Sequence, residues 1–232
     1  MVNWFSRFIT SSIGKKLVMA LTGLFLITFL PVHLIGNTLL LAGDGGQSFN
    51  EYAYFMTHNP LIKTVSYGLY AFILIHAIQG IILWRQNRAA RGSEGYAVKV
   101  NRTAGASRIS SVNMGAIGTI ILVFILVHMY QFWLQMKLGH TAMVTYAGGE
   151  QPVKDLFTLV SGVYKNVGFV IFYVVSMLFI GFHLWHGFES AFQTLGLNHR
   201  KYTPLIKFVG RAYSVIIPIG FAVIPVLMFL WN

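Results

Sequence analysis

The sequence contains no cysteine among its 232 residues. This absence excludes disulfide bonds, iron–sulfur ligation by this chain and thiolate metal sites. Any metal or redox chemistry on the chain must therefore use its eight histidines.

Charged residues are also scarce. They make up 10% of the chain, whereas a soluble globular domain carries about 25%. Hydrophobic residues reach 56% and the mean hydropathy is +0.65, and a soluble fold of this length has too little interior to bury so much apolar surface. The composition excludes intrinsic disorder, collagen and coiled coil. It indicates an integral membrane protein that forms a single domain over residues 1–232.

Five apolar stretches are long enough to cross a hydrocarbon core of about 30 Å, which takes about 20 helical residues. They are continuous rather than alternating, which excludes a β-barrel. We therefore expect an all-α protein with five transmembrane helices. The expected spans are residues 17–41, 61–84, 112–136, 167–188 and 212–231. Asn59 and Pro60, just before the second stretch, are typical of an N-cap and a first helical residue.

The distribution of basic residues predicts the orientation. Most of the 17 lysines and arginines fall in the N-terminal segment and in the second and fourth loops. By the positive-inside rule these parts face the cytoplasm, so the N-terminus is expected inside and the C-terminus outside. The net charge of +11 then marks cytoplasmic loops rather than a nucleic-acid partner.

Histidine is almost the only ionisable residue type inside the expected spans. Ionisable groups in a bilayer are costly and mark functional sites. His33 and His128 lie about 16 residues into spans that run outward, roughly 24 Å from the cytoplasmic boundary. His76 and His183 lie equally far into spans that run inward, so they fall in the inner third. The depths predict two pairs, His33 with His128 and His76 with His183.

Two imidazoles from facing helices can ligate one iron axially, with a porphyrin edge-on in a four-helix core. Glycines follow three of these histidines on the same helical face, where they would leave room for a flat macrocycle. They are Gly36, Gly80 and Gly187. Zinc is disfavoured because no third or fourth ligand converges. We therefore expect two haem b groups in a bundle of the first four spans, with the outer pair and the inner pair as axial ligands.

Two motifs carry a resemblance to a known family: HLIGN at residues 33–37, and HLWHG at 183–187 followed by LGL at 195–197. With them the chain resembles the single-chain, five-helix, dihaem cytochrome b subunit of succinate:quinone oxidoreductase (succinate dehydrogenase or fumarate reductase, respiratory complex II). The resemblance covers nearly the whole chain, and it places the haem ligands on the first four helices.

The resemblance also implies partners and a location. Members of this family sit in the cell's inner (cytoplasmic) membrane and anchor a flavoprotein subunit and an iron–sulfur subunit on the cytoplasmic face. Electrons pass between succinate or fumarate there and a membrane quinone, usually menaquinone in dihaem members. This reaction links the tricarboxylic acid cycle to electron transport.

The fourth span offers a second histidine, His186, three residues after His183. The family pattern sets its ligand thirteen residues before a glycine that ends the helix, and His183 and Gly196 match it. His183 is therefore the expected ligand. His186 is expected to contact a haem propionate or to bond a backbone carbonyl.

A quinone site on the outer side needs a group that exchanges protons with the quinone. Glu51 is the candidate, because it lies just outside the second span near the expected height of the outer haem, beside aromatic residues in 52–55. The family uses a glutamate in this region, although its spacing from the first ligand differs here. A solvated loop acid is the alternative, and a rival quinone site would lie at the cytoplasmic end near Ser11 and Ser12.

Two other functions stay open at this point. One is the cytochrome b subunit of a different membrane oxidoreductase, such as a hydrogenase or a formate dehydrogenase. The other is a proton conductor or transporter that uses its histidines as relays. Haem absorption bands would exclude the transporter, and co-purification of a flavin subunit that oxidises succinate would exclude the other oxidoreductases.

Overall fold

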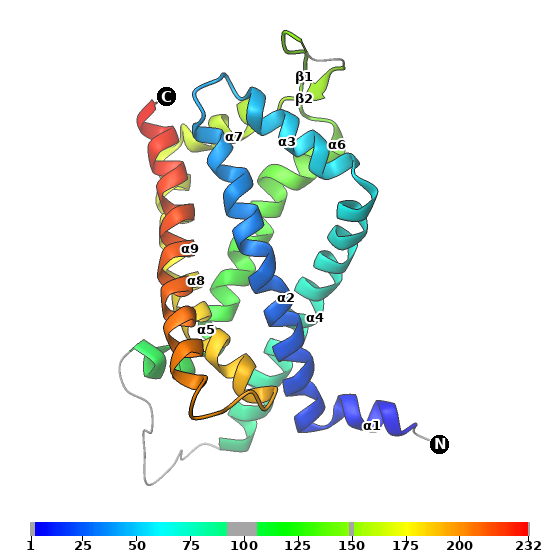
Figure 1. The fold of residues 1–232 in the computed structure, drawn as a ribbon, viewed down its shortest axis with the longest axis vertical. Helices are drawn as coiled ribbons and strands as arrows, with labels where there is room; N and C mark the ends of the chain where they lie inside the picture. Colours follow the sequence, from blue (N-terminus) through cyan, green and yellow to red (C-terminus); the bar gives the residue numbers. More distant parts are fainter. Residues whose placement is uncertain (1–2, 92–105, 149–150, 232) are drawn as a thin grey trace. The chain divides into compact units, whose positions relative to one another are not determined.

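The chain is almost entirely helical in the computed structural model, which describes residues 3–91, 106–148 and 151–231 (Figure 1). The long helices are α2 (Ser12–Thr38), α4 (Pro60–Arg91), α5 (Ala106–His128), α8 (Val167–Thr194) and α9 (Thr203–Trp231). The short helices are α1 (Trp4–Thr10), η1 (Leu39–Leu41), α3 (Gln47–His58), η2 (Met129–Leu134), α6 (Gln135–Leu138) and α7 (Leu156–Tyr164). A small hairpin pairs β1 (Met143–Val144) antiparallel with β2 (Val153–Lys154).

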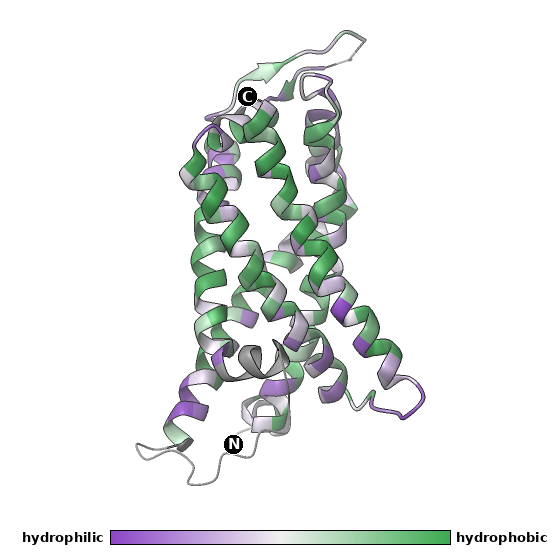
Figure 2. Cartoon of the chain, turned by 90° about the vertical axis from the view of Figure 1, so that its left-hand side faces the viewer, coloured by the Kyte–Doolittle hydropathy of each residue, from purple (hydrophilic) through white to green (hydrophobic). Residues whose placement is uncertain are grey.

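Within the described residues, five helices are long and apolar enough to cross a membrane, which agrees with the predicted number of spans. They cover Ser12–Leu41, Pro60–Ala90, Asn113–Leu138, Val167–Thr194 and Thr203–Trp231. Hydrophobic residues occupy most of their length (Figure 2). Most of them extend beyond the predicted stretches, because polar residues continue the helix past the apolar run. The direction in which they cross and the haem-binding role of four of them stay predictions, and Lys99 and Arg102 of the second loop lie outside the described residues.

The start of α4 follows the predicted capping pattern. The side-chain Oδ1 of Asn59 accepts hydrogen bonds from the backbone N–H groups of Leu61 (3.0 Å) and Ile62 (3.2 Å). Pro60 occupies the first helical position, where the N–H that proline lacks would have had no partner in the helix. The sequence therefore predicts this helix start correctly.

Contacts within the chain gather into two compact units, each built from parts of several long helices. The first unit contains Met1–Thr28, Leu69–Thr119 and Ile180–Val215. The second contains Phe29–Gly68, Ile120–Phe179 and Ile216–Asn232. The single domain expected over residues 1–232 stays a prediction, and we describe each unit by itself.

In the first unit, α9 supplies a hydrogen bond that a proline takes away from α2. Pro31 lies inside α2 and has no N–H to donate to the carbonyl of Ile27, four residues earlier. The hydroxyl of Tyr213, on α9, donates to this carbonyl instead. The proline is tolerated because the Ile27 carbonyl, which it leaves without a partner in α2, accepts a hydrogen bond from another helix.

In the second unit, the side chain of Asn50 ties α3 to the start of α7. Asn50 is 1% exposed. Its Nδ2 donates to the Tyr146 hydroxyl (2.8 Å) and to Asp155 Oδ1 (3.1 Å), and its Oδ1 accepts from the N–H groups of Leu156 (3.0 Å) and Phe157 (2.9 Å). The amide therefore uses both its hydrogens and both its lone pairs.

Asp155 is the second polar residue of this junction, as the N-cap of α7. Its Oδ1 accepts a hydrogen bond from the N–H of Thr158 at 3.0 Å. Burial alone would raise the pKa of Asp155, but the hydrogen bonds from Thr158 and Asn50 outweigh burial and lower this pKa. The carboxylate is therefore held in its charged form at the positive end of a helix dipole.

We expect Tyr213→Phe to destabilise the protein by roughly 1–3 kcal/mol, because the Ile27 carbonyl loses its partner in a place without water. In a Pro31→Ala background the same change should cost much less, since the alanine supplies the missing backbone N–H. A double-mutant cycle on thermal unfolding in detergent measures this coupling. Equal losses in both backgrounds would contradict the role assigned to Tyr213.

We also expect Asn50→Leu to lower the unfolding temperature by several degrees. The substitution strands two backbone N–H groups at the start of α7 and removes a donor from Asp155, each worth about 1–3 kcal/mol when buried. Gln47→Leu, on the same helix, is the control, because the Gln47 amide reaches only the exposed carboxylate of Glu51. An Asn50→Leu protein as stable as the control would show that the junction contributes nothing.

Candidate functional site

The four predicted histidines lie in two close pairs, each within one unit. In the second unit, the ring of His33 on α2 lies 5.9 Å from that of His128 at the end of α5, centroid to centroid. In the first unit, the ring of His76 on α4 lies 6.0 Å from that of His183 on α8. These are the pairs that the depths in the sequence predict. Their role as ligands stays a prediction.

The spacing within each pair fits two ligands of one metal ion. Two imidazoles on opposite sides of a metal have ring centres roughly 6 Å apart, because each metal–nitrogen bond is about 2 Å and each nitrogen lies about 1 Å from its ring centre. Within the described residues, no group of three or more His, Asp or Glu side chains is placed to hold an ion. Each site therefore offers two imidazoles, which is the donor set of a bis-histidine haem.

Aromatic rings surround the His33–His128 pair. Phe29 stacks on His33 at 5.0 Å, and Phe221 of α9 lies 5.5 Å from the same ring. Phe124 stacks on His128 at 5.8 Å, and Phe132 and Tyr173 lie at 5.3 and 6.1 Å. The rings give the pair an apolar environment in which a neutral imidazole is favoured over a charged one.

Most hydrogen bonds of the four rings use Nδ1. Its neighbour is Asn37 Nδ2 for His33 (3.3 Å), the Thr22 hydroxyl for His76 (3.2 Å) and the Tyr173 hydroxyl for His128 (3.5 Å). His183 differs, since its Nδ1 is buried and has no partner among the described residues. His76 also forms a hydrogen bond with the backbone of Met19. Asn37 Nδ2 carries only hydrogens, so in its contact with His33 the ring Nδ1 is the acceptor.

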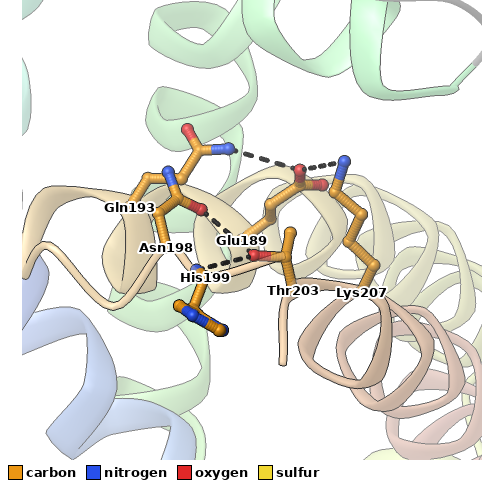
Figure 3. A network of polar contacts seen from close by, with 6 residues as sticks. All are labelled: Glu189, Gln193, Asn198, His199, Thr203 and Lys207. Atoms are coloured by element: carbon orange, nitrogen blue, oxygen red, sulfur yellow. Dashed lines mark hydrogen bonds and ion pairs between the residues drawn. The ribbon is translucent and has the colours of Figure 1, made fainter. Parts of the chain in front are cut away.

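His186 belongs to a different environment from His183. It lies one turn further along α8, is half-buried and interacts electrostatically with Glu189. Glu189 forms an ion pair with Lys207 of α9 at 3.1 Å and accepts a hydrogen bond from Gln193 at 3.3 Å (Figure 3). Thr203 and the backbone N–H of His199 bond nearby, in the turn that joins α8 to α9. The structure therefore puts His183, and not His186, beside His76.

Glu51 lies on the exposed side of α3, a helix that the sequence does not predict. Its Oε1 accepts a hydrogen bond from Gln47 at 2.9 Å. The aromatic residues beside it point to different neighbours: Tyr52 packs on α2, where burial raises its pKa, and the ring of Tyr54 stacks on His58 at 3.9 Å. Glu51 is thus exposed, which fits both a group that exchanges protons and the solvated acid that the sequence left as the alternative.

The three glycines predicted to make room near the histidines differ from one another. A Cβ at Gly36 would lie 2.4 Å from a ring carbon of Tyr52, so this glycine lets α3 pack against α2. A Cβ at Gly80 would meet only a flexible Met19 methyl at 3.6 Å, and one at Gly187 would meet nothing within 4 Å. Only the last two lie where the chain leaves space.

Some residues near the histidines were not predicted from the sequence. Thr22, Gln131 and Tyr173 are buried polar residues inside spans, and each contacts a histidine or its partner. Gln131 lies in η2, a π-helical turn that directly follows His128, and such turns are frequent at functional sites. The signal available in the sequence was that these polar residues lie inside apolar spans that also contain the histidines.

Comparison with protein-family models, with curated proteins and with solved structures gives no match for this chain. The two histidine pairs and the sequence motifs around them are therefore the features that bear on function.

Proposed function

We propose that this chain is the dihaem cytochrome b membrane anchor of a succinate:quinone oxidoreductase, carrying electrons between an iron–sulfur subunit and membrane menaquinone through two haems b. The observation that supports this most is the pairing of His33 with His128 and of His76 with His183, at 5.9 and 6.0 Å. Two separate two-histidine sites on apolar helices suit two bis-histidine haems. The motifs at 33–37 and 183–197 favour this family over other membrane cytochromes.

In this proposal the four imidazoles hold the cofactors and the surrounding side chains keep water out. Haem iron, when bound, alternates between two oxidation states and so carries one electron at a time. Neutral imidazoles would supply nitrogen lone pairs to that iron, and the aromatic rings around His33 and His128 would maintain a low dielectric environment. Lower reorganisation of solvent in such an environment favours fast electron transfer.

The proposed partners follow from the same assignment. The flavoprotein and iron–sulfur subunits bind the cytoplasmic face of the anchor and carry out the dicarboxylate chemistry. Glu51 is the proposed proton-exchanging group for quinone on the other side, with its carboxylate as the acceptor or donor. The proposed location is the inner (cytoplasmic) membrane.

Purification of the complex from membranes tests the proposal. We expect reduced-minus-oxidised absorption bands of haem b, two haems for each copy of this chain, and a co-purifying flavin subunit that oxidises succinate. A purified chain without haem would overturn the proposal. Haem with a different peripheral enzyme would reassign the partner but retain the cytochrome.

Single substitutions of the histidines should each remove one haem. We expect His76→Ala and His183→Ala to lose one haem, and His33→Ala and His128→Ala to lose the other, so that haem content halves in each case. His186→Ala is the matched control on α8 and should retain both. Loss of a haem from His186→Ala, with both retained in His183→Ala, would make His186 the ligand.

Glu51→Gln should separate quinone chemistry from the rest of the complex. The substitution retains size and hydrogen bonding but cannot exchange a proton, so quinone-linked turnover should fall at least tenfold. Succinate oxidation with an artificial dye, which takes electrons from the peripheral subunits, should be unchanged, as should haem content. Unchanged quinone turnover would remove Glu51 from the mechanism.

A further inference from the structure

Two of the four histidines contact a hydroxyl group on another helix. In the first unit, Thr22 of α2 places its Oγ1 3.2 Å from Nδ1 of His76 on α4. In the second unit, Tyr173 of α8 places its hydroxyl 3.5 Å from Nδ1 of His128 on α5. Both hydroxyl residues are buried, at 5% and 4% exposure.

The hydrogen of Thr22 is already used. Its hydroxyl donates to the carbonyl of Val18 at 2.7 Å, with Met19 O as a second acceptor at 3.2 Å. A hydroxyl has one hydrogen and two lone pairs, so toward His76 it can only accept. A hydrogen bond between the two therefore requires the proton of His76 on Nδ1, with the lone pair on Nε2.

The same accounting applies to Tyr173. Its hydroxyl donates to Oε1 of Gln131 at 2.8 Å, so it too can only accept from Nδ1 of His128. Gln131 is 8% exposed and lies in the π-helical turn η2. Because that turn follows His128 directly, it brings Gln131 and His128 to the same hydroxyl.

A glycine next to Thr22 lets the His76 ring come close. A Cβ at Gly23 would lie 3.2 Å from Cε1 of His76, which is closer than most Cβ contacts, and at an ordinary 3.7 Å from its Nδ1. A threonine that bonds its own helix is common in membrane spans. Such bonding within one helix requires neither an imidazole that faces the threonine nor a glycine beside it, and Thr22 has both.

We propose that Thr22 and Tyr173 are positioning residues that fix His76 and His128 as Nδ1–H tautomers, so that Nε2 presents its lone pair to a haem iron. This inference rests on the proposed function. A hydrogen bond donated from Nδ1 makes the imidazole a stronger electron donor, which favours oxidised iron. Each hydroxyl should therefore lower the reduction potential of the haem in its own unit and leave the other haem unaffected.

Redox titration of the purified complex, followed by haem absorption, tests the inference. Thr22→Val, which retains the shape and removes the hydroxyl, should raise the midpoint potential of one haem. Tyr173→Phe should raise that of the other. The one-haem variants His183→Ala and His33→Ala assign each potential to its site. General destabilisation is not expected to give this pattern, in which each substitution changes the midpoint potential of a different haem.

Matched controls separate the hydrogen bonds from packing. Thr22→Ser retains the acceptor and should leave both potentials as in the unchanged protein. Thr28→Val removes another hydroxyl of α2, one that donates only to the carbonyl of Phe25, and should also change neither. Tyr164→Phe removes the hydroxyl of a tyrosine whose ring centre lies 5.3 Å from that of Tyr173, and it should likewise change neither potential.

The outcomes distinguish this inference from the proposed function. A complex without haem would overturn the proposed function. Two haems with unchanged potentials in both Thr22→Val and Tyr173→Phe would overturn the inference alone. If Thr22→Val loses its haem, Thr22→Ser decides: retention of the haem supports the hydroxyl, and loss of the haem there too shows that the hydroxyl does not suffice, which overturns the role assigned to it.

Discussion

The cost of an unpaired polar group in a hydrocarbon environment is the constraint on which this structure depends. Inside a hydrocarbon core, a backbone carbonyl or a side-chain nitrogen without a partner costs several kcal/mol of stability. This cost is about as large as the stability that a buried leucine side chain contributes. The carbonyl of Ile27, freed by Pro31, is paired by Tyr213. The amide of Asn50 has all its bonding capacity used where short elements meet outside the spans. The histidines are under the same constraint, and a bound metal would satisfy the nitrogens that the chain does not.

The fifth long helix, α9, is subject to the same constraint, although none of the four histidines lies on it. α9 has no histidine, yet its residues support α2 in both units. In the first unit Tyr213 pairs the Ile27 carbonyl, and in the second Phe221 lies beside the ring of His33 while Gly220 accommodates Leu34, which a Cβ there would approach to 2.7 Å. A helix without any of the four histidines thus holds the helix that carries His33.

The sequence predicts features that follow from distance along one helix. Span number and the Asn59 cap follow from the length of the apolar run and from a local capping pattern, and the structure agrees with both. The depth of each histidine in a membrane stays a prediction. The pairing of histidines could be predicted because two helices that cross the same bilayer share its thickness. The helices α3 and α7 were missed because they are short, lie outside the spans and are held by contacts from Asn50, not by their own periodicity.

Contacts between distant parts of the chain could not be predicted in this way. Gly36 and Gly23 both lie on α2, but Gly36 faces Tyr52 and Gly23 faces His76. Thr22 and His76 are separated by 54 positions, and only their proximity in space turns a common threonine into a hydrogen-bond acceptor for an imidazole. In the proposed tautomer, the direction of one hydroxyl hydrogen decides which ring nitrogen of His76 keeps its proton. A sequence pattern can therefore predict a ligand, whereas the contacts that would fix its tautomer are visible only in the folded chain.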